Sequence, residues 1–158
     1  MEMKIKWKPL LIALAIPLAV GGLAALLTMN SMETFGRLNQ PPLAPPGWLF
    51  PVVWTILYLL MGLASYLVYT SGGSRTAIRQ ALTLYAAQLA VNFFWSILFF
   101  NYNQYLLAFL WLLLLWGLIL ATLISFYRLS PLAGYLLIPY LVWVTFAGYL
   151  NFAIYLLN

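Results

Sequence analysis

Long apolar segments separated by short polar ones dominate the sequence. Charged residues leave four uninterrupted intervals, at 9–32, 38–74, 80–127 and 129–158. A helix needs about 20 apolar residues to cross the hydrocarbon core of a bilayer, so the third interval holds two crossings, separated at the polar 101–104 (Asn-Tyr-Asn-Gln). The pattern predicts five membrane-spanning helices, at about 9–29, 47–70, 77–100, 104–127 and 132–156.

These segments favour an all-α fold over a membrane β-barrel. Barrel strands alternate lipid-facing and lumen-facing residues, whereas 110–116 (Leu-Trp-Leu-Leu-Leu-Leu-Trp) is apolar throughout. The sequence therefore predicts an integral membrane bundle of five transmembrane helices, forming one domain over 1–158. The first span also resembles a secretory signal peptide, but its apolar stretch, 10–27, is longer than the usual core of about 7–15 residues. We expect it to be retained.

Prolines mark several expected helix ends. The segment 30–46 is rich in proline, and we expect it to form a lid between the first and second helices. Pro45 suits the start of the second helix, because its missing N–H has no helical partner there. Pro131 breaks the chain between the fourth and fifth helices. Pro17 and Pro139 fall inside predicted helices, where we expect kinks.

The composition supports a membrane protein and narrows its chemistry. Hydrophobic residues make up 66% of the chain and charged residues only 6%, against about 25% charged in soluble domains. Cysteine and histidine are absent, and the only carboxylate side chains are Glu2 and Glu33. Disulfides, thiol nucleophiles, histidine relays and paired-carboxylate catalysis are therefore excluded, and we assign no catalytic residue and no metal ligand. The net charge of +5 is too dispersed for a nucleic-acid surface.

The distribution of Lys and Arg predicts the orientation. Arg37 is the only basic residue on one side of the predicted spans. Six basic residues fall on the other side: Lys4, Lys6, Lys8, Arg75, Arg79 and Arg128. Because Lys and Arg accumulate in cytoplasmic loops, we expect the N-terminus inside and the C-terminus outside, in a bacterial cell membrane. The proline-rich lid is then extracytoplasmic.

Polar and aromatic side chains gather in the outer half of the predicted bundle. Gln88, Asn92 and Trp95 are spaced i, i+4, i+7, which places them on one face of the third helix. The second and fifth helices have similar stripes, at Trp54, Tyr58 and Met61 and at Trp143, Ala147 and Asn151. An unpaired amide in hydrocarbon costs roughly 2–7 kcal/mol, so we expect these faces to look inward. The pattern predicts a pocket for a flat, largely apolar ligand with a few polar edges.

Structural roles compete with ligand binding at these positions. Trp and Tyr near helix ends usually anchor a helix at the membrane interface, which suits Trp48. Intramembrane Asn and Gln also join helices through hydrogen bonds, so Asn92 is compatible with both roles. The remaining indoles, Trp54, Trp95 and Trp143, fall within the spans, where the anchoring role fits poorly.

Three motifs, in order and at helical spacing, resemble those of one known family. They are PPGWxFxxxWxxLYxxM at 45–61, QxxxNxxWSxxFF at 88–100 and PYxxWxxFAxYLN at 139–151. On these motifs the chain is similar to the translocator protein / tryptophan-rich sensory protein family, once called peripheral-type benzodiazepine receptors, over essentially its whole length. The resemblance implies a membrane receptor or sensor. Such proteins bind tetrapyrroles such as protoporphyrin IX and haem, and synthetic isoquinoline carboxamides, in a cavity beneath the lid.

The resemblance also implies which residues contact the ligand. By motif position these are Pro45, Trp54, Asn92, Trp143 and Ala147, with Gln88 and Phe35 beside them. Together with the positions given by spacing, the predicted ligand-binding set is Phe35, Pro45, Trp54, Tyr58, Gln88, Asn92, Trp95, Trp143, Ala147 and Asn151. We expect no obligatory cofactor. Metal-free porphyrin suits the chain better than haem, because iron ligation would fall to tyrosine alone.

Two departures from the family pattern bear on the ligand. The family's lid often has Trp-Tyr where this chain has Thr34-Phe35, so we expect different contacts between lid and ligand. Animal members, which also bind cholesterol, have a basic residue after the tyrosine of a late sterol motif. No basic residue follows Tyr149 here, which lowers the expectation of sterol binding.

Other functions remain open beside a tetrapyrrole sensor. A transporter of tetrapyrroles or similar molecules is one alternative, although no inverted repeat and no intramembrane charge supports it. Light-dependent breakdown of bound porphyrin, which the resemblance also implies for some members, is another, and a subunit of a larger membrane complex is a third. Members are commonly dimeric, and we expect a homodimer through the small residues Ala86 and Ala90 of the third helix.

Overall fold

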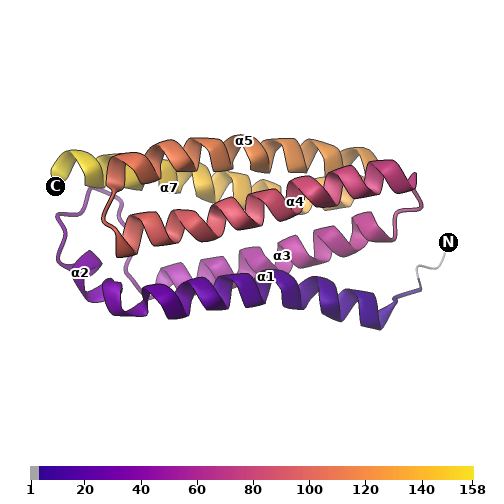
Figure 1. Ribbon diagram of the computed structural model, residues 1–158, viewed down its shortest axis with the longest axis horizontal. Helices are drawn as coiled ribbons and strands as arrows, with labels where there is room; N and C mark the ends of the chain where they lie inside the picture. Colours follow the sequence, from indigo (N-terminus) through magenta and orange to yellow (C-terminus); the bar gives the residue numbers. More distant parts are fainter. Residues whose placement is uncertain (1–3) are drawn as a thin grey trace.

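The computed structural model describes residues 4–158 as a bundle of long helices (Figure 1). Its elements are α1 (Trp7–Thr28), the 3₁₀ turn η1 (Met29–Ser31), α2 (Met32–Gly36), α3 (Leu49–Tyr69), α4 (Arg75–Ser96), the π-helical η2 (Ile97–Asn101), α5 (Tyr105–Leu129), α6 (Pro131–Leu136) and α7 (Ile138–Leu157). Five helical stretches are long and apolar enough to cross a membrane, and residues 4–158 contain no strand. The prediction of an all-α integral membrane protein with five spans is confirmed.

The five spans run along one common axis (Figure 1). α1 packs on α3, α4 on α5 and α5 on α7, while α6 packs on α3. Glycine permits one close crossing: a Cβ on Gly62 of α3 would lie 2.7 Å from the carbonyl oxygen of Ala13 and 2.8 Å from the Cα of Leu14, both on α1. The two backbones therefore touch, as small residues allow in membrane helix pairs.

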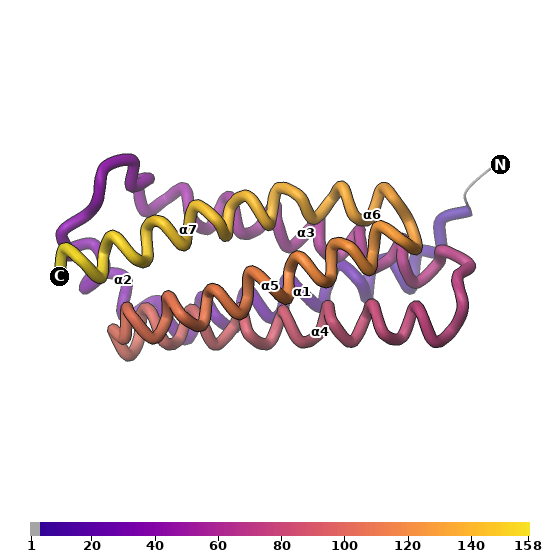
Figure 2. Tube along the Cα trace, turned by 90° about the horizontal axis from the view of Figure 1, so that it is seen from above, coloured from indigo at the N-terminus to yellow at the C-terminus, as the bar shows by residue number. Residues whose placement is uncertain are grey.

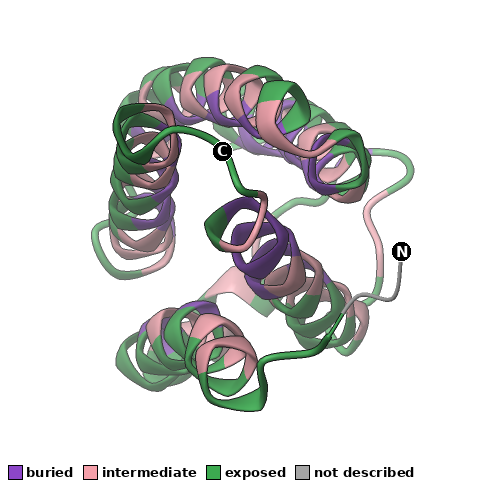
Figure 3. Cartoon of the chain, turned by 90° about the vertical axis from the view of Figure 1, so that its right-hand side faces the viewer, coloured by how far each residue is buried: buried purple, intermediate pink, exposed green. Residues whose placement is uncertain are grey.

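Each span buries one face and exposes another (Figure 3). Met61, Ile119, Phe126 and Tyr140 are among the core side chains and have almost no exposed surface. Leucine, isoleucine and valine cover much of the outside, and α1 is the least buried span. Exposed apolar surface on this scale marks a protein whose surroundings are lipid.

The lid is shorter than the sequence predicts. A loop is expected over 30–46, but η1 and α2 continue the helix to Gly36, and α3 begins at Leu49. The helix continues because no proline interrupts it before Pro41. The non-helical connection, residues 37–48, is called the lid loop below. It lies beside the C-terminal end of α7 (Figure 2).

The fifth span is broken near its start. The kink expected at Pro139 takes the form of a break: α6 ends at Leu136, α7 begins at Ile138, and Leu137 lies between them. Pro139 therefore occupies the first turn of α7, where its missing N–H costs no helical hydrogen bond. Pro17, in contrast, lies inside α1.

A π-helical turn ends the third span, at the polar segment expected to separate the third and fourth helices. Asn103 turns the chain in the left-handed region, with a φ of 53°, which Asn tolerates better than most residues. The Asn101 side chain joins this turn to the end of the first span: its Nδ2 donates to the carbonyl oxygen of Leu27 at 3.0 Å and its Oδ1 accepts from the Ser31 hydroxyl at 2.7 Å. These two hydrogen bonds hold the end of the first span against the end of the third span.

Candidate functional site

A cavity of about 660 Å³ lies inside the bundle, at the end that contains the lid loop and the C-terminal end of α7. Residues of α1, α2, α3, α4, η2 and α7 form its walls, and the lid loop contributes to its lining. Small-molecule sites typically have volumes of about 300–1,000 Å³. Eight of the ten predicted site residues line this cavity: Phe35, Pro45, Trp54, Tyr58, Trp95, Trp143, Ala147 and Asn151.

The other two predicted residues, Gln88 and Asn92, are not part of the lining. Both are only 2% exposed and bond to Tyr140 of α7. The Asn92 amide donates to the Tyr140 hydroxyl at 2.8 Å, and that hydroxyl donates to Gln88 Oε1 at 2.7 Å. A protein group therefore satisfies these amides, and the network joins α4 to α7 within the core.

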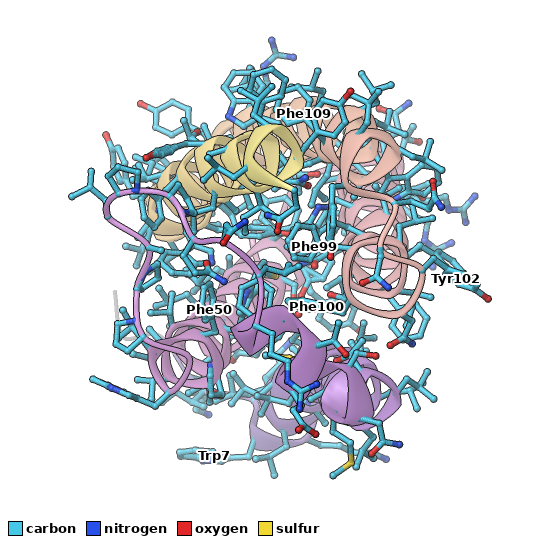
Figure 4. All side chains as sticks on the ribbon, turned by 90° about the vertical axis from the view of Figure 1, so that its left-hand side faces the viewer. Trp7, Phe50, Phe99, Phe100, Tyr102 and Phe109 are labelled. Atoms are coloured by element: carbon cyan, nitrogen blue, oxygen red, sulfur yellow. The ribbon has the colours of Figure 1, made fainter. Side chains whose placement is uncertain are left out.

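Aromatic rings from several elements form most of the cavity wall. Phe35 of α2 contacts Phe50, Phe99 and Phe100, with ring centroids 5.3–6.0 Å apart. Figure 4 looks into this end of the bundle and shows the last three gathered near its centre. Phe99 and Phe100, both in the π-helical turn, line the wall together.

The tryptophans add flat faces to this wall. Trp54 stacks on Tyr58 at 5.6 Å and 29°, and Trp95 stacks on Phe99 at 5.4 Å and 25°. Trp143 meets Phe50 at 6.0 Å in an edge-to-face contact. Stacked and edge-to-face geometries are the favourable ones for aromatic pairs. A flat aromatic guest would find the same kinds of contact here.

Some polar side chains of the lining are already paired within the protein. The Trp95 indole donates to Asn151 Oδ1 at 3.0 Å, and Asn151 Nδ2 donates to the carbonyl oxygen of Tyr105 at 2.8 Å. The Trp143 Nε1 is different: it is buried and has no hydrogen-bond partner among residues 4–158. A buried donor without a partner is costly, so this N–H would gain from an acceptor. The Trp54 indole and the hydroxyls of Tyr58 and Ser96 also line the cavity and make no hydrogen bond within residues 4–158.

A glycine on α1 makes room for one wall of the cavity. A Cβ on Gly21 would lie 2.2 Å from Cε2 of the Tyr58 ring, whereas a Cβ on Gly22 would meet nothing within 4 Å. The Tyr58 ring therefore lies directly against the α1 backbone at Gly21. A larger residue at this position would push the ring away from α1.

Hydrogen bonds fasten the lid loop to α7 over the cavity. Asn158 Oδ1 accepts from the Asn39 backbone N–H and its Nδ2 donates to the Asn39 carbonyl oxygen, both at 3.2 Å. Asn39 Nδ2 donates to the carbonyl oxygen of Leu157 at 3.3 Å, and the Tyr149 hydroxyl donates to that of Pro42 at 2.7 Å. These four contacts, called the lid bonds below, hold the lid loop against the C-terminal end of the bundle.

Sequence reasoning missed a large part of the lining. The missed residues include Gly21, Ala24, Thr28, Met29, Met32, Phe50, Phe99, Phe100, Leu150 and Ile154. Phe50, Phe99, Phe100 and Leu150 lie inside the motifs quoted above, so the motifs themselves held the signal. The first span offered none, because it is almost uniformly apolar and no face stands out.

The cavity lining is mainly apolar and aromatic. No group of three or more His, Cys, Asp or Glu side chains able to hold a metal ion occurs within residues 4–158. Glu33 and Arg37 pair at 2.6 Å, but both side chains are more than three-quarters exposed. Such exposed pairs contribute little to stability. What the arrangement offers is aromatic surface, a volume of about 660 Å³ and a few hydrogen-bonding groups.

These features define a membrane protein of five helical spans with an aromatic cavity enclosed in one end of its bundle. The sequence model of the TspO/MBR family matches residues 13–157. The chain belongs to this family.

Three relatives align with nearly the full length of this chain. The chain is 39% identical over 150 residues to the tryptophan-rich protein TspO of Chlorobaculum tepidum, covering 94% of this chain and 95% of that protein. It is 40% identical over 156 residues to the tryptophan-rich sensory protein of Cereibacter sphaeroides, covering 99% and 95%. It is also 38% identical over 148 residues to the translocator protein of Bos taurus, covering 92% and 88%. The resemblance inferred from the motifs is confirmed.

Proposed function

We propose that this membrane protein acts as a receptor or sensor for porphyrins, with protoporphyrin IX as the representative ligand. The observation that carries the proposal is the cavity of about 660 Å³, lined by eight of the ten residues predicted from the sequence. Related flat, apolar molecules would fit the same chemistry. The name of the Cereibacter sphaeroides relative, a sensory protein, supports a receptor over an enzyme.

The lining favours a flat macrocycle without metal. Trp54, Trp95 and Trp143 offer stacking faces, and the unpaired indole N–H of Trp143 suits a carboxylate at the edge of a porphyrin. Because the chain has no His and no Cys, haem iron would find only tyrosine as an anionic ligand. No cofactor is needed for binding of this kind.

Titration with protoporphyrin IX tests the proposal. Tryptophan fluorescence should quench saturably, and the Trp54→Phe/Trp143→Phe double variant should bind more weakly. Losing two indole contacts removes roughly 1–2 kcal/mol, or about a 5- to 30-fold rise in Kd. The matched control is Trp7→Phe/Trp48→Phe, which also removes two indoles, but from side chains 64% and 68% exposed and outside the cavity lining.

Two results would reject the proposal. Unsaturable quenching would mean that porphyrin merely partitions into the bilayer. Equal affinity in the cavity variant and the control would mean that it binds elsewhere on the protein. Gradient-driven porphyrin flux in liposomes would support the transporter alternative, and a discrete product formed on illumination would support porphyrin breakdown.

Orientation and assembly form part of the same proposal. We propose that the cavity end faces outward, because the chain has six basic residues on the other side of the spans and only Arg37 on this side. Ala86 and Ala90 of α4 are exposed in the single chain, which is compatible with a homodimer through this face. Replacing both by leucine should reduce the dimer fraction in detergent.

A further inference from the structure

A second hollow lies on the outside of the bundle between α3 and α7. It is an open depression with a volume of about 540 Å³ and is called the side groove below. Its lining includes Val53, Ile56 and Leu60 of α3 and Val142, Trp143 and Phe146 of α7. Every residue of the lining is apolar and lies within a membrane-spanning segment. In a bilayer the side groove therefore faces hydrocarbon rather than water.

The indole of Trp143 separates the side groove from the cavity. Trp143 is the one residue common to the two linings, so we place its side chain in the wall between them. Between α3 and α7 the space is filled by side chains and not by a close contact of the two backbones. α3 packs on α6, whereas the backbones of α3 and α7 stay farther apart. A rotation of this one side chain would connect the two hollows.

Apolar contacts alone hold the Trp143 indole in place. Its ring lies 6.0 Å from the ring of Phe50 and 5.7 Å from that of Phe146, and its N–H has no partner among residues 4–158. The indoles of Trp95 and Trp111, in contrast, each donate a hydrogen bond, at 3.0 and 2.7 Å. Rotating Trp143 therefore breaks no hydrogen bond.

The lid loop, unlike the Trp143 side chain, is held by hydrogen bonds. Opening the end of the bundle to water would break the four lid bonds, which include the paired contacts between Asn39 and Asn158 and the contact between Tyr149 and Pro42. A hydrophobic guest is also more concentrated in the bilayer than in water. Both differences favour access from the side.

We propose that apolar ligands reach the cavity from the bilayer, through the side groove and past a rotated Trp143 indole, while the lid loop stays closed. The route rests on the proposed function only for the identity of the natural ligand. Its gating residue is Trp143, and its outer edges are Ile56 and Val142.

A thiol placed in the cavity tests the route without any porphyrin. The chain has no native cysteine, so Ala147→Cys provides a single thiol in the cavity lining. In liposomes, we expect a maleimide dissolved in the bilayer, N-(1-pyrenyl)maleimide, to label this thiol. A water-soluble methanethiosulfonate reagent with a charged sulfonate group should label this thiol far more slowly. Val142→Cys, at a position 63% exposed towards lipid, gives the reference rate for the bilayer reagent.

Three variants made in the Ala147→Cys background locate the entrance. Trp143→Ala should raise the labelling rate from the bilayer by about tenfold or more, because it removes the wall. Val142→Trp should lower it several-fold by filling the groove from an exposed position that tolerates substitution. Asn158→Ala weakens the lid bonds and should leave the bilayer rate within about twofold.

The opposite pattern would overturn the route. If Asn158→Ala accelerates labelling by both reagents while the two groove variants change nothing, ligands pass the lid loop. If the bilayer reagent fails to label the cavity thiol even with Trp143→Ala, the side wall does not open. Protoporphyrin IX titrations on the unmodified chain are read separately. If porphyrin does not bind but the labelling follows the expected pattern, the proposed ligand is rejected and the route is retained.

Discussion

Replacing Tyr140 by phenylalanine tests the buried network beneath the cavity. The Tyr140 hydroxyl accepts from the Asn92 amide at 2.8 Å and donates to Gln88 Oε1 at 2.7 Å, and the side chain is 1% exposed. The substitution keeps the ring and removes only the hydroxyl. It therefore leaves two buried amide groups without their partner while changing the packing very little.

Two considerations set the magnitude of the effect. Leaving a buried polar group unpaired costs about 1–3 kcal/mol, which would give roughly 2–6 kcal/mol for two groups. Between membrane helices, however, a hydrogen bond is worth about 0.6 kcal/mol on average and at most about 1.7, because unfolded helices in the bilayer find other partners. The second consideration applies to a helix bundle in lipid, so we expect Tyr140→Phe to cost about 1–3 kcal/mol.

The free energy of unfolding is measured by steric trapping in bicelles. Tyr127→Phe is the matched control, since Tyr127 is 45% exposed and should change stability by less than about 0.5 kcal/mol. A double-mutant cycle with Asn92→Leu isolates the shared hydrogen bond. If Tyr140→Phe costs no more than the control, the network contributes nothing to stability. Gln88 and Asn92 would then be free to serve the ligand directly, contrary to the present interpretation.

Two glycine substitutions give further tests, each with a neighbouring or equivalent control. Gly21→Ala should push the Tyr58 ring away from α1, whereas Gly22→Ala meets open space; we expect a several-fold rise in the Kd for protoporphyrin IX in the first only, measured by fluorescence titration. Gly62→Val should separate α1 from α3 and lower the free energy of unfolding by about 2–4 kcal/mol, whereas Gly117→Val on the open face of α5 should change it little. Equal effects within either pair would show that the close contacts described above are not tight.

The spans and the facing stripes were predictable because they rest on strong local signals. Hydrocarbon requires long apolar helices, and the cost of a lone amide requires that polar faces turn inward. These two constraints predict that Trp54, Trp95 and Trp143 face the interior, and all three line the same cavity. Both constraints act on each helix separately, so they can be applied without knowing how the helices pack.

The parts of the site that the sequence did not predict depend on which of several suitable partners each residue contacts in the fold. The need of Asn92 for a hydrogen bond was evident, but a ligand and the Tyr140 hydroxyl satisfy it equally well on chemical grounds. The contribution of α1 left no trace, because a uniformly apolar helix has no periodicity to read. The exact position of the break near Pro139 also depends on packing, since a proline fits both inside a kinked helix and in a first turn.

The bundle is solid at one end and hollow at the other, and this difference links stability to binding. Away from the cavity, Ala64, Ala81 and Ile119 are fully buried, and Tyr85 stacks on Phe126 at 5.7 Å and 6°. This packed part holds the helices in position while the other end stays open enough for a guest. A ligand that fills the cavity supplies contacts that this end lacks, so it must stabilise the folded state by an amount that grows with the logarithm of its concentration. Binding at the hollow end and the stability of the whole bundle are therefore thermodynamically linked.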